Sequence, residues 1–228
     1  MREITKEATK EYLMQIKNSP LFAGMNEEEI EHILECQNTQ IASYEKENYI
    51  FREGQNIYSF GMVLSGSVHM VKDDLWGNRS ILAKMTAGQI FGQSVCFMDG
   101  EALAFSVVAA EKTVVMFLDS RETLTVCSKT CFSHNHLIHN LVQVMAEANQ
   151  VLMRKIEHTS QRTTRDKILS YLSDESRRQR SLTFEIPFNR QQLAEYLNVD
   201  RSAMSATLGK LKKEGILTFD KNKFTILS

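Results

Sequence analysis

The stretch NRQQLAEYLNVDRSAMSATLGKLKKEG, residues 189–215, contains two short helical patterns separated by a few polar residues. Asn189 and Asp200 stand where the two helices need N-caps, and Asn198 stands at the turn, where a left-handed backbone must be tolerated. Apolar residues line the inner side of the pair: Leu193, Ala194, Leu197, Val199, Met204 and Leu208. This combination predicts a helix-turn-helix rather than a generic helical hairpin, although Thr207 falls where an apolar residue is usual.

The segments on either side of this pair predict a winged helix-turn-helix. DKILSYLSDES (166–176) has the period of a helix, with Ile168, Leu169 and Leu172 inward. SLTFEIPF (181–188) alternates apolar and polar residues as a strand does, placing Leu182, Phe184, Ile186 and Phe188 on one face. GILTFDKNKFTILS (215–228) predicts two more strands about a turn at 220–222.

In a helix-turn-helix the second helix enters the major groove with its first turn. The predicted base contacts are therefore its outward residues there: Arg201, Ser202, Ser205 and Ala206. Arg201 can bind a guanine through two hydrogen bonds or hold a phosphate, whereas the serines are less selective. The predicted phosphate contacts are Asn189, Arg190, Gln191, Lys210, Lys212, Lys213, Lys221 and Lys223. For any single lysine, an ordinary solvated face is an equal alternative.

Charge is unevenly distributed along a chain whose net charge is −1. Residues 159–228 contain 13 Lys and Arg against 8 Asp and Glu, a net charge of +5. The first 158 residues contain 14 against 20, a net charge of −6. A basic end on an acidic body suggests a polyanionic partner for that end, although ordinary scatter can also produce such a difference.

The sequence pattern of the segment from about 40 to 120 is typical of an antiparallel β-domain. Short apolar runs are separated by glycines at positions 54, 61, 66, 77, 88, 92 and 100, which indicates many turns. Residues 76–78 read as the turn of a hairpin. Before this segment, Asn26 and Glu29 form a capping-box pattern ahead of a helix with Ile30, Ile33 and Leu34 on one face.

Residues 133–158 contain no Gly or Pro and predict one long helix with two parallel apolar stripes. The first stripe, with heptad spacing, is expected to pair with an identical helix in a homodimer, through Leu137, Leu141, Val144, Ala148 and Val151. The second would pack on the chain's own body, through Ile138, Val142, Met145, Asn149, Leu152 and Ile156. The alternative is one wide stripe that faces a single core.

Composition places the chain among soluble globular proteins, since 43% of residues are hydrophobic and 24% are charged. The charged amino terminus is not a signal peptide, no apolar run is long enough for a membrane span, and four cysteines make no disulfide framework. We therefore expect a cytoplasmic protein with no membrane association. The expected α+β domains are a sensor domain at 1–132, a dimerisation helix at 133–158 and a DNA-binding domain at 159–228.

CSKTCFSHNHLIH (127–139) resembles a ligand cluster, with two cysteines and three histidines. The structural interpretation is favoured over zinc, because His134 and His136 would point apart at the start of the long helix. A redox role for Cys127 and Cys131 stays open. Axial haem ligands are not expected either, since His69 is the only histidine between positions 33 and 133. We expect no metal and no bound cofactor.

Taken together, the chain resembles the Crp/Fnr family of bacterial transcription regulators over nearly its whole length. The resemblance rests on SPLFAGMNEEEIEHIL (19–34), the pattern G-x-I-F-G (88–92), RTTRDKILSYL (162–172) and the 189–215 unit. It implies an N-terminal antiparallel β-roll of the cupin-like or jelly-roll type, a homodimer through the long helix, binding to an inverted repeat in double-stranded DNA, and RNA polymerase as a partner.

The resemblance departs from the cyclic-AMP-binding members in the sensor domain. Those members have Glu after F-G and later an Arg-Ser pair, whereas Gln93 and the pair Leu103-Ala104 stand here. A phosphate beside Leu103 would lose its ionic partner, so cyclic AMP is not expected as the effector. An apolar effector would meet the residues Phe91, Gly92, Gln93, Ser94, Leu103, Ala104, Leu141 and Met145. A filled pocket without ligand is the alternative.

In the second helix, Ala206 replaces an Arg that family members often use on DNA. The predicted function is a non-enzymatic, sequence-specific regulator, in which an unidentified effector shifts the packing of the sensor domain on the long helix. The rival hypothesis is a ligand-binding or enzymatic protein whose winged helix mediates protein contacts. No nucleophile–base pair or paired carboxylate stands out to favour catalysis.

Overall fold

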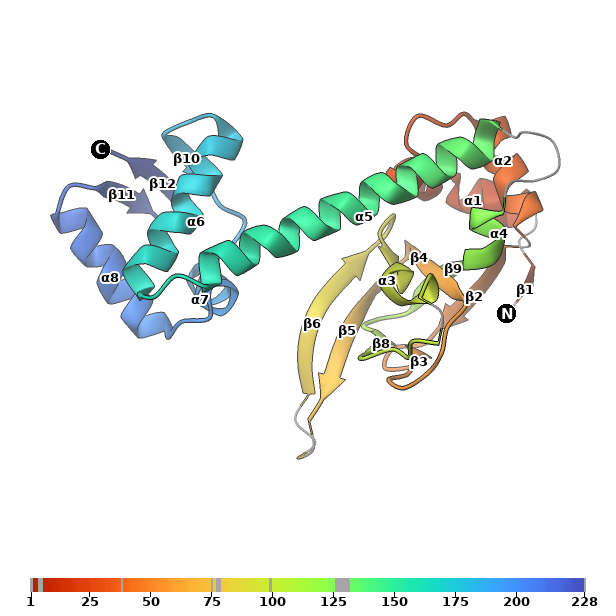
Figure 1. Cartoon of the computed structure of the whole chain (residues 1–228), viewed down its shortest axis with the longest axis horizontal. Helices are drawn as coiled ribbons and strands as arrows, with labels where there is room; N and C mark the ends of the chain where they lie inside the picture. The colour runs from red at the N-terminus through yellow and green to blue at the C-terminus, as the bar shows by residue number, and fades with distance from the viewer. Residues whose placement is uncertain are drawn as a thin grey trace. The chain divides into compact units, whose positions relative to one another are not determined.

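The computed structural model describes residues 2–3, 6–37, 39–74, 76, 79–98, 100–125 and 132–227, with side chains from residue 11 onward. The chain divides into two compact units, Met1–Met145 and Ala146–Ser228, whose elements are labelled in Figure 1. Within the described ranges, no helix combines the length and apolar content needed to cross a bilayer. The 28-residue helix α5 (Phe132–Thr159) contributes residues to both units.

The first unit is built on two antiparallel sheets, as the glycine-punctuated sequence predicts. The five-stranded sheet has the order β1-β2-β9-β4-β7, with bounds Arg2–Glu3, Gln40–Tyr44, Thr113–Asp119, Ser59–Ser65 and Ile90–Phe91. The four-stranded sheet has the order β3-β8-β5-β6, with bounds Tyr49–Phe51, Ser106–Ala109, Ser67–Asp73 and Arg79–Thr86. Strands β5 and β6 pair as the predicted hairpin. Residues 77 and 78 of its predicted turn lie outside the described residues.

The helices of the first unit flank these sheets (Figure 1). They are α1 (Lys6–Lys17), the 3-10 turn η1 (Pro20–Phe22), α2 (Glu27–Cys36), α3 (Gln93–Cys96) and α4 (Ser120–Leu124). The capping box predicted at the start of α2 is present, since Asn26 Oδ1 accepts from the Glu29 amide at 2.9 Å and the Glu29 carboxylate accepts from the Asn26 amide at 2.8 Å. The predicted inward residues Ile30, Ile33 and Leu34 are buried.

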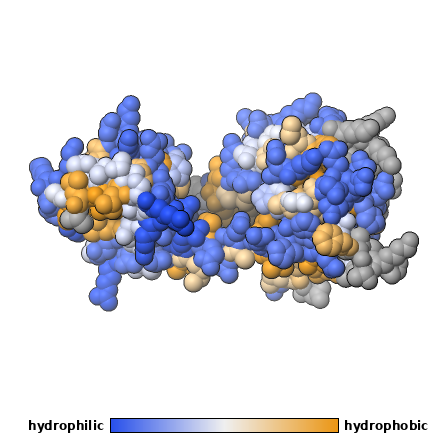
Figure 2. Space-filling view, turned by 90° about the horizontal axis from the view of Figure 1, so that it is seen from above, coloured by the Kyte–Doolittle hydropathy of each residue, from blue (hydrophilic) through white to orange (hydrophobic). Residues whose placement is uncertain are grey.

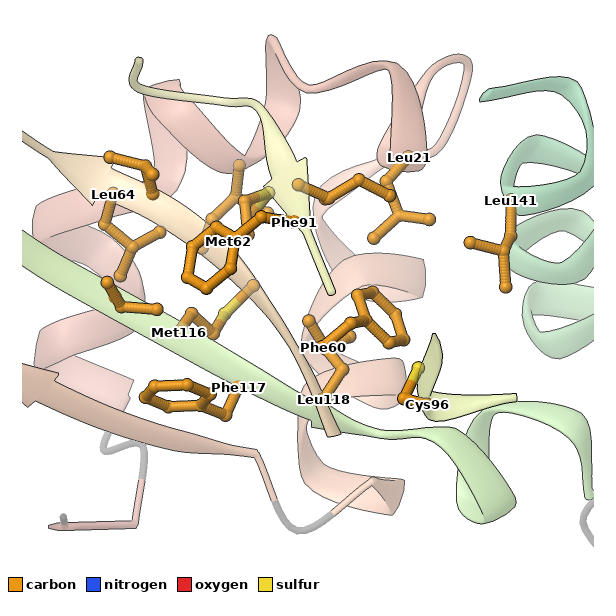
Figure 3. Packing of buried hydrophobic residues seen from close by; sticks show 14 of the residues in the cluster. Leu21, Phe60, Met62, Leu64, Phe91, Cys96, Met116, Phe117, Leu118 and Leu141 are labelled. Carbon is orange, nitrogen blue, oxygen red and sulfur yellow. The ribbon is translucent and has the colours of Figure 1, made fainter. Parts of the chain in front are cut away.

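Residues from both sheets, α2 and α5 share the core of the first unit (Figure 3). Phe91 is central to it: its ring packs edge-on against Phe51 at a centroid distance of 5.8 Å. The ring also lies over Gly61 of the neighbouring strand β4, where an added Cβ would meet Phe91 Cζ at 2.3 Å. Gly61 is therefore required by this close approach of an aromatic ring to the backbone.

The face of α5 that enters this core corrects the predicted dimer stripe. Leu137 and Leu141 are 0% and 2% exposed and belong to the core of their own chain, and Val144 packs against it. Asn140 reinforces this contact, because its side-chain amide donates to the carbonyls of Leu21 at 3.1 Å and Ala23 at 3.0 Å. The first part of the predicted dimer stripe is thus used by the chain itself.

The outward side of α5 carries the other predicted stripe. Val142, Leu152 and Ile156 are each about 60% exposed, and Met145 is 39% exposed. Apolar groups elsewhere on the surface lie in patches among the hydrophilic residues, as one face of the molecule shows (Figure 2). Val142 and Met145 therefore do not pack on the core that holds Leu137 and Leu141, whereas Ile138 of the same predicted stripe is half-buried.

The second unit has the predicted order of a winged helix-turn-helix. Its elements after α5 are α6 (Thr164–Gln179), β10 (Thr183–Glu185), α7 (Arg190–Leu197), α8 (Arg201–Lys213), β11 (Leu217–Asp220) and β12 (Lys223–Ile226). The three strands form an antiparallel sheet of order β10-β12-β11. Ile168, Leu172, Phe184 and Ile186 are buried as predicted. Leu182 is not: it is 63% exposed because β10 begins only at Thr183.

We expect Gly61→Ala to destabilise the first unit by about 1–3 kcal/mol, the usual cost of overpacking a core, because the new methyl group overlaps the Phe91 ring. Gly209→Ala is the control, since nothing lies within 4 Å of a Cβ built there and alanine is the better helix former. Urea unfolding followed by circular dichroism measures both. Equal midpoints for Gly61→Ala and wild type would contradict the close contact.

Candidate nucleic-acid interface

Both helices of the predicted helix-turn-helix begin at the predicted caps. Asn189 Oδ1 accepts from the Gln192 amide at 3.0 Å, while Gln192 Oε1 accepts from the Asn189 amide at 2.9 Å, which makes a capping box at α7. Asp200 Oδ1 accepts from the Ala203 amide at 2.8 Å and caps α8. These bonds satisfy amides that a helix start leaves without partners, so the start of each helix is determined locally.

The turn between α7 and α8 depends on the backbone conformation of Asn198. Its φ of 51° and ψ of 59° lie in the left-handed region, as predicted. The Val199 amide then donates to the carbonyl of Ala194 at 3.0 Å and closes the turn. Lys167 of α6 adds a contact that sequence reasoning missed: its ammonium donates to the carbonyls of Leu197 at 3.3 Å and Asn198 at 3.4 Å. A cation at the end of α7 also suits the helix dipole.

The buried and exposed sides of α8 are clearly separated. Met204, Leu208 and Leu211 are buried against the rest of the second unit. Thr207, where an apolar residue is usual, is half-buried, and its hydroxyl donates to the Ala203 carbonyl at 2.8 Å. The threonine therefore satisfies its polar group within its own helix, which explains why it is tolerated at this position.

All four predicted base-contact residues, Arg201, Ser202, Ser205 and Ala206, are exposed in the first turns of α8. The Ser202 hydroxyl donates to Asp200 Oδ1 at 2.5 Å, and the Ser205 hydroxyl donates to the Arg201 carbonyl at 2.9 Å. Their oxygens still offer lone pairs to a donor. The hydrogen bonds from Ser202 and the Ala203 amide hold the Asp200 pKa below its usual value, so a fixed negative charge stands beside Arg201.

The predicted phosphate contacts differ in how far they are already engaged by other groups. Lys210, Lys213, Lys221 and Lys223 are exposed around α8 and the turn between β11 and β12. The side chains at the start of α7 have partners, since Asn189 caps the helix and the Gln191 amide donates to Glu195 Oε1 at 2.7 Å. Arg190 and Lys212 lie over aromatic rings of the wing.

The guanidinium of Arg190 joins the start of α7 to the wing. Its Cζ lies 4.6 Å from the ring centroid of Phe219 and 5.0 Å from that of Phe224, and burial lowers its pKa from the ordinary value. The Lys212 ammonium lies 5.3 Å from the Phe219 centroid. These cation–π contacts hold the wing beside α7 and α8, so Arg190 also has a packing role that the sequence did not predict, and its predicted phosphate contact stays a prediction.

A cavity of about 490 Å³ lies beside these contacts, between the start of α7 and the turn of the wing. It is lined by Pro187, Phe188, Asn189, Arg190, Gln192, Lys221 and Asn222. Two of its lining residues are basic and three carry side-chain amides, so its polar groups suit an anionic partner such as a phosphate. The cavity places Asn189 and Lys221, two predicted phosphate contacts, in one hollow.

The predicted effector residues of the first unit are mostly packed. Phe91, Leu103 and Leu141 are at most 2% exposed and belong to one core cluster. An open cleft large enough for water would leave accessible area on these side chains, so they meet each other and their neighbours directly. Gly92, with a φ of 84°, lies so close to Ile57 that an added Cβ would be 3.1 Å from its Cδ1. Gln93 is half-buried, and Ser94, Ala104 and Met145 are exposed.

Lys72 holds the segment around Leu103 and Ala104, a role that sequence reasoning missed. Its ammonium donates to the Ala104 carbonyl at 2.7 Å and to Glu53 Oε1 at 2.5 Å. The Leu103 backbone is also bound, since its amide donates to the Gln55 carbonyl at 3.0 Å and its carbonyl accepts from the Gly54 amide at 2.8 Å. The sequence contained a signal for this contact, because strand alternation puts Lys72 on the same face of the sheet as the apolar residue Met70. Lys72 therefore fixes the backbone at Ala104 while it forms an ion pair with Glu53.

The histidines after Cys131 lie apart, and Cys127 and Cys131 themselves lie outside the described residues. His134 is buried, with its ring centroid 6.3 Å from that of His32, while His136 packs against Gly24 and Phe132. Within the described part of the chain, no group of three or more His, Cys, Asp or Glu side chains is placed to hold a metal ion. Burial raises the pKa of the Cys96 thiol to about 12, which keeps it unreactive.

Comparison with known proteins matches both units. Residues 41–130 match the cyclic nucleotide-binding domain family, and residues 166–228 match the Crp-like helix-turn-helix domain family. The cyclic AMP receptor protein of Thermus thermophilus is 26% identical over 202 residues, which cover 89% of each chain.

Two solved structures share the fold. The c-di-GMP responsive global regulator CLP of Xanthomonas campestris aligns with a TM-score of 0.55 and 16% identity, over 89% of this chain and 100% of that one. A CprK variant complexed with OCPA aligns with a TM-score of 0.55 and 17% identity, over 88% of this chain and 90% of that one.

We expect Asn198→Ala to destabilise the second unit by roughly 1–2 kcal/mol, the cost of a left-handed backbone for an ordinary residue. Asn198→Gly is the matched variant, because glycine adopts this conformation without strain and should unfold close to wild type. Thermal unfolding of both variants tests the turn. If alanine and glycine have the same effect, the left-handed conformation is not what determines the residue at this position.

Proposed function

We propose, from the premise that this chain belongs to the Crp/Fnr family, that it is a homodimeric transcription regulator that binds an inverted repeat in double-stranded DNA. The observation that carries the proposal is the first turn of α8, where Arg201, Ser202 and Ser205 are exposed together on a capped and well-packed helix. Such a turn is what a winged helix-turn-helix inserts into the major groove. The nearby lysines supply the sequence-independent attraction to phosphates.

The outward stripe of α5 supports the dimer. Val142, Met145, Asn149, Leu152 and Ile156 repeat at intervals of three and four residues and are all exposed. An apolar heptad stripe on a long helix is covered by a second such helix in a coiled coil, and a single Asn in it favours one register. Ala148 and Val151 of the originally predicted stripe are exposed beside it. The dimer surface is thus shifted around the helix from the predicted one.

Two copies related by a twofold axis would present two α8 helices to half-sites one helical turn apart, which is why the target is an inverted repeat. Readout of bases falls on Arg201, with Ser202 and Ser205 as weaker readers and Ala206 able to contact a thymine methyl group. The family makes RNA polymerase the expected second partner of the DNA-bound dimer. We assign no catalytic residues to the protein.

The regulatory input of the first unit is proposed to differ from that of the cyclic AMP receptor protein. An effector entering between Phe91, Leu103 and Leu141 would have to displace packed side chains, and a phosphate there would meet Leu103 and not a guanidinium. Lys72 is already bound to Glu53 and Ala104. A cyclic nucleotide is therefore disfavoured as the effector.

The deciding experiment selects duplexes from a random pool with the reduced protein and no added ligand, at several salt concentrations. Enrichment of a twofold symmetric site, with affinity that falls steeply with salt, would support the regulator. Binding that ignores both salt and DNA sequence would favour the rival hypothesis, in which the winged helix contacts another protein.

At the selected site, Arg201→Ala should cost about 1–3 kcal/mol of binding free energy and relax the preference at one base pair per half-site. Lys213→Ala is the contrasting variant, because loss of a phosphate contact weakens all sequences alike and reduces the salt slope by about 1. Fluorescence anisotropy on the selected duplex and on a scrambled one measures both. If Arg201→Ala weakens binding to both duplexes equally, Arg201 holds a phosphate.

Leu152→Asp should dissociate the dimer, because it places a charge in the middle of the apolar stripe, where desolvation is costly. Gln150→Asp adds the same charge on the same helix outside the stripe and should leave the dimer intact. Sedimentation equilibrium over a range of protein concentrations gives the dissociation constants. A Leu152→Asp protein as dimeric as the Gln150→Asp control would rule out this stripe.

A further inference from the structure

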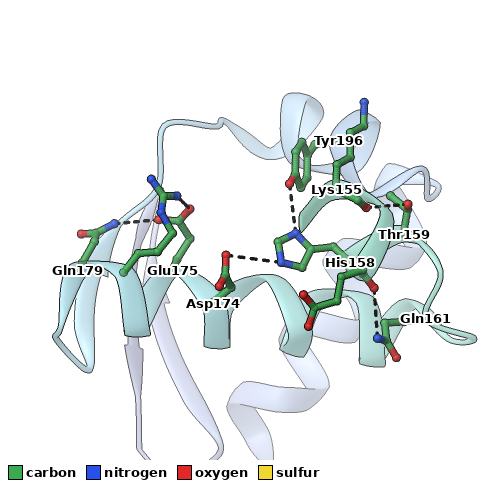
Figure 4. A network of polar contacts seen from close by, with 10 residues as sticks. Lys155, His158, Thr159, Gln161, Asp174, Glu175, Gln179 and Tyr196 are labelled. Atoms are coloured by element: carbon green, nitrogen blue, oxygen red, sulfur yellow. Dashed lines mark hydrogen bonds and ion pairs between the residues drawn. The ribbon is translucent and has the colours of Figure 1, made fainter. Parts of the chain in front are cut away.

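A buried histidine lies at the point where α5 ends. His158 is in the last turn of α5, is 2% exposed, and is followed by the short connection to α6, which begins at Thr164. Its ring packs edge-on against Tyr171 of α6 at 5.5 Å and lies 6.0 Å from the ring of Tyr196 of α7. The imidazole thus joins the end of α5 to two other helices of the second unit, α6 and α7, and Figure 4 shows it between Asp174 and Tyr196.

The two ring nitrogens of His158 have different surroundings. Nδ1 lies 3.1 Å from the hydroxyl of Tyr196, within hydrogen-bond distance. Nε2 is buried and has no hydrogen-bond partner among the described residues. The nearest carboxylate oxygen on α6, Oδ2 of Asp174, lies 3.8 Å away, too far for a hydrogen bond and close enough for an ion pair. The surroundings therefore offer no acceptor at hydrogen-bond distance to Nε2, which a protonated ring would need because it donates from both nitrogens.

Titratable groups surround this ring on each helix packed around it. On α6 they are Asp174 and Glu175, and Glu175 is itself bound by Arg178 at 2.5 Å and Gln179 at 3.1 Å. On α7 it is the Tyr196 hydroxyl, whose ring also has the Lys155 ammonium over it, and on α5 they are Arg154 and Glu157. Desolvation by burial lowers the pKa of His158, and the carboxylates of Asp174, Glu157 and Glu175 oppose this in part.

We propose that His158 acts as a pH-dependent joint. When the surroundings become acidic, its protonation moves the end of α5 relative to α6 and α7. A proton gained at Nε2 makes the imidazole a cation that donates from both nitrogens. Asp174 is the acceptor within reach, but a charged N–H···O bond needs a separation of about 2.8 Å, so the end of α5 and the middle of α6 must approach each other. The contact with the Tyr171 ring, which suits a neutral imidazole, is also less favourable for the charged one.

The direction of the pH effect follows from the lowered pKa. Since the folded state binds this proton less readily than the unfolded chain does, the neutral imidazole stabilises the second unit above pH 6.5, the ordinary histidine value. That contribution is lost as the pH falls from 6.5 through the lowered pKa of His158. The contacts of His158 therefore stabilise the second unit at neutral pH and are weakened in acid.

The effect of His158 protonation on regulation rests on the proposed DNA binding, whereas the pH-dependent joint at His158 does not. Tyr196 belongs to α7, so a displaced His158 disturbs the helix that supports α8. If acidification reduces the competent fraction to a tenth, the apparent dissociation constant for DNA rises about tenfold. General protonation acts in the opposite sense, because a more positive protein is attracted more strongly to phosphates.

Two measurements on the full-length protein test the joint. Nuclear magnetic resonance of labelled histidine follows the His158 ring and the amides of residues 159–164 from pH 8 to pH 5. We expect both to titrate together, below pH 6.5, and Asp174→Asn to move the midpoint lower because the carboxylate that favours the cation is removed. A ring that titrates without any response of these amides, or a midpoint that Asp174→Asn leaves unchanged, would overturn the proposal.

The second measurement is affinity for the selected duplex at pH 7.5 and pH 5.5. Wild type and His139→Gln, which changes an exposed histidine of the same helix, should lose affinity in acid, whereas His158→Gln should not. A His158→Gln protein with the wild-type pH response would refute the coupling to DNA. If wild type binds no DNA at either pH, the proposed function fails, and the resonance titration still decides the joint. Should His158→Gln not fold, Asp174→Asn carries the same test.

Discussion

The burial of α5 at both of its ends is the constraint on which the rest of the structure depends. Leu137 and Leu141 belong to the core of the first unit, and His158 lies in the aromatic cluster of the second. A helix that is held at each end keeps its remaining apolar side chains outward, and these form the heptad stripe from Val142 to Ile156. The two core contacts thus decide which face of α5 is left exposed.

Helix α8 is positioned by short-range interactions that reinforce one another. Asn198 provides the left-handed turn, Lys167 binds the carbonyls that end α7, and Asp200 caps α8. Arg190 then joins this pair to the wing through two aromatic rings. Because each contact is local to the second unit, the surface offered to DNA is preorganised, which reduces the entropy lost on binding.

The first unit shows how the chain's own side chains fill the region in which the sequence predicts an effector. Phe91 and Leu103 are packed in the core, and Lys72 is paired with Glu53 and bound to the Ala104 carbonyl. A lysine on β5 thus neutralises a carboxylate of the chain itself and fixes the backbone beside Leu103.

The sequence by itself determined the elements whose signals are local: the caps at Asn26, Asn189 and Asp200, the turn at Asn198, the alternating strands and the long unbroken helix. Each depends on residues within one or two turns of one another, so spacing and residue type are sufficient. Only the tertiary structure decided which stripe of α5 is outward, that Arg190 stacks on the wing, and that Lys72, Lys167 and His158 act at a distance in sequence. Both adjacent stripes of α5 are largely apolar, so the choice between them is made by the strands and helices that pack against the helix.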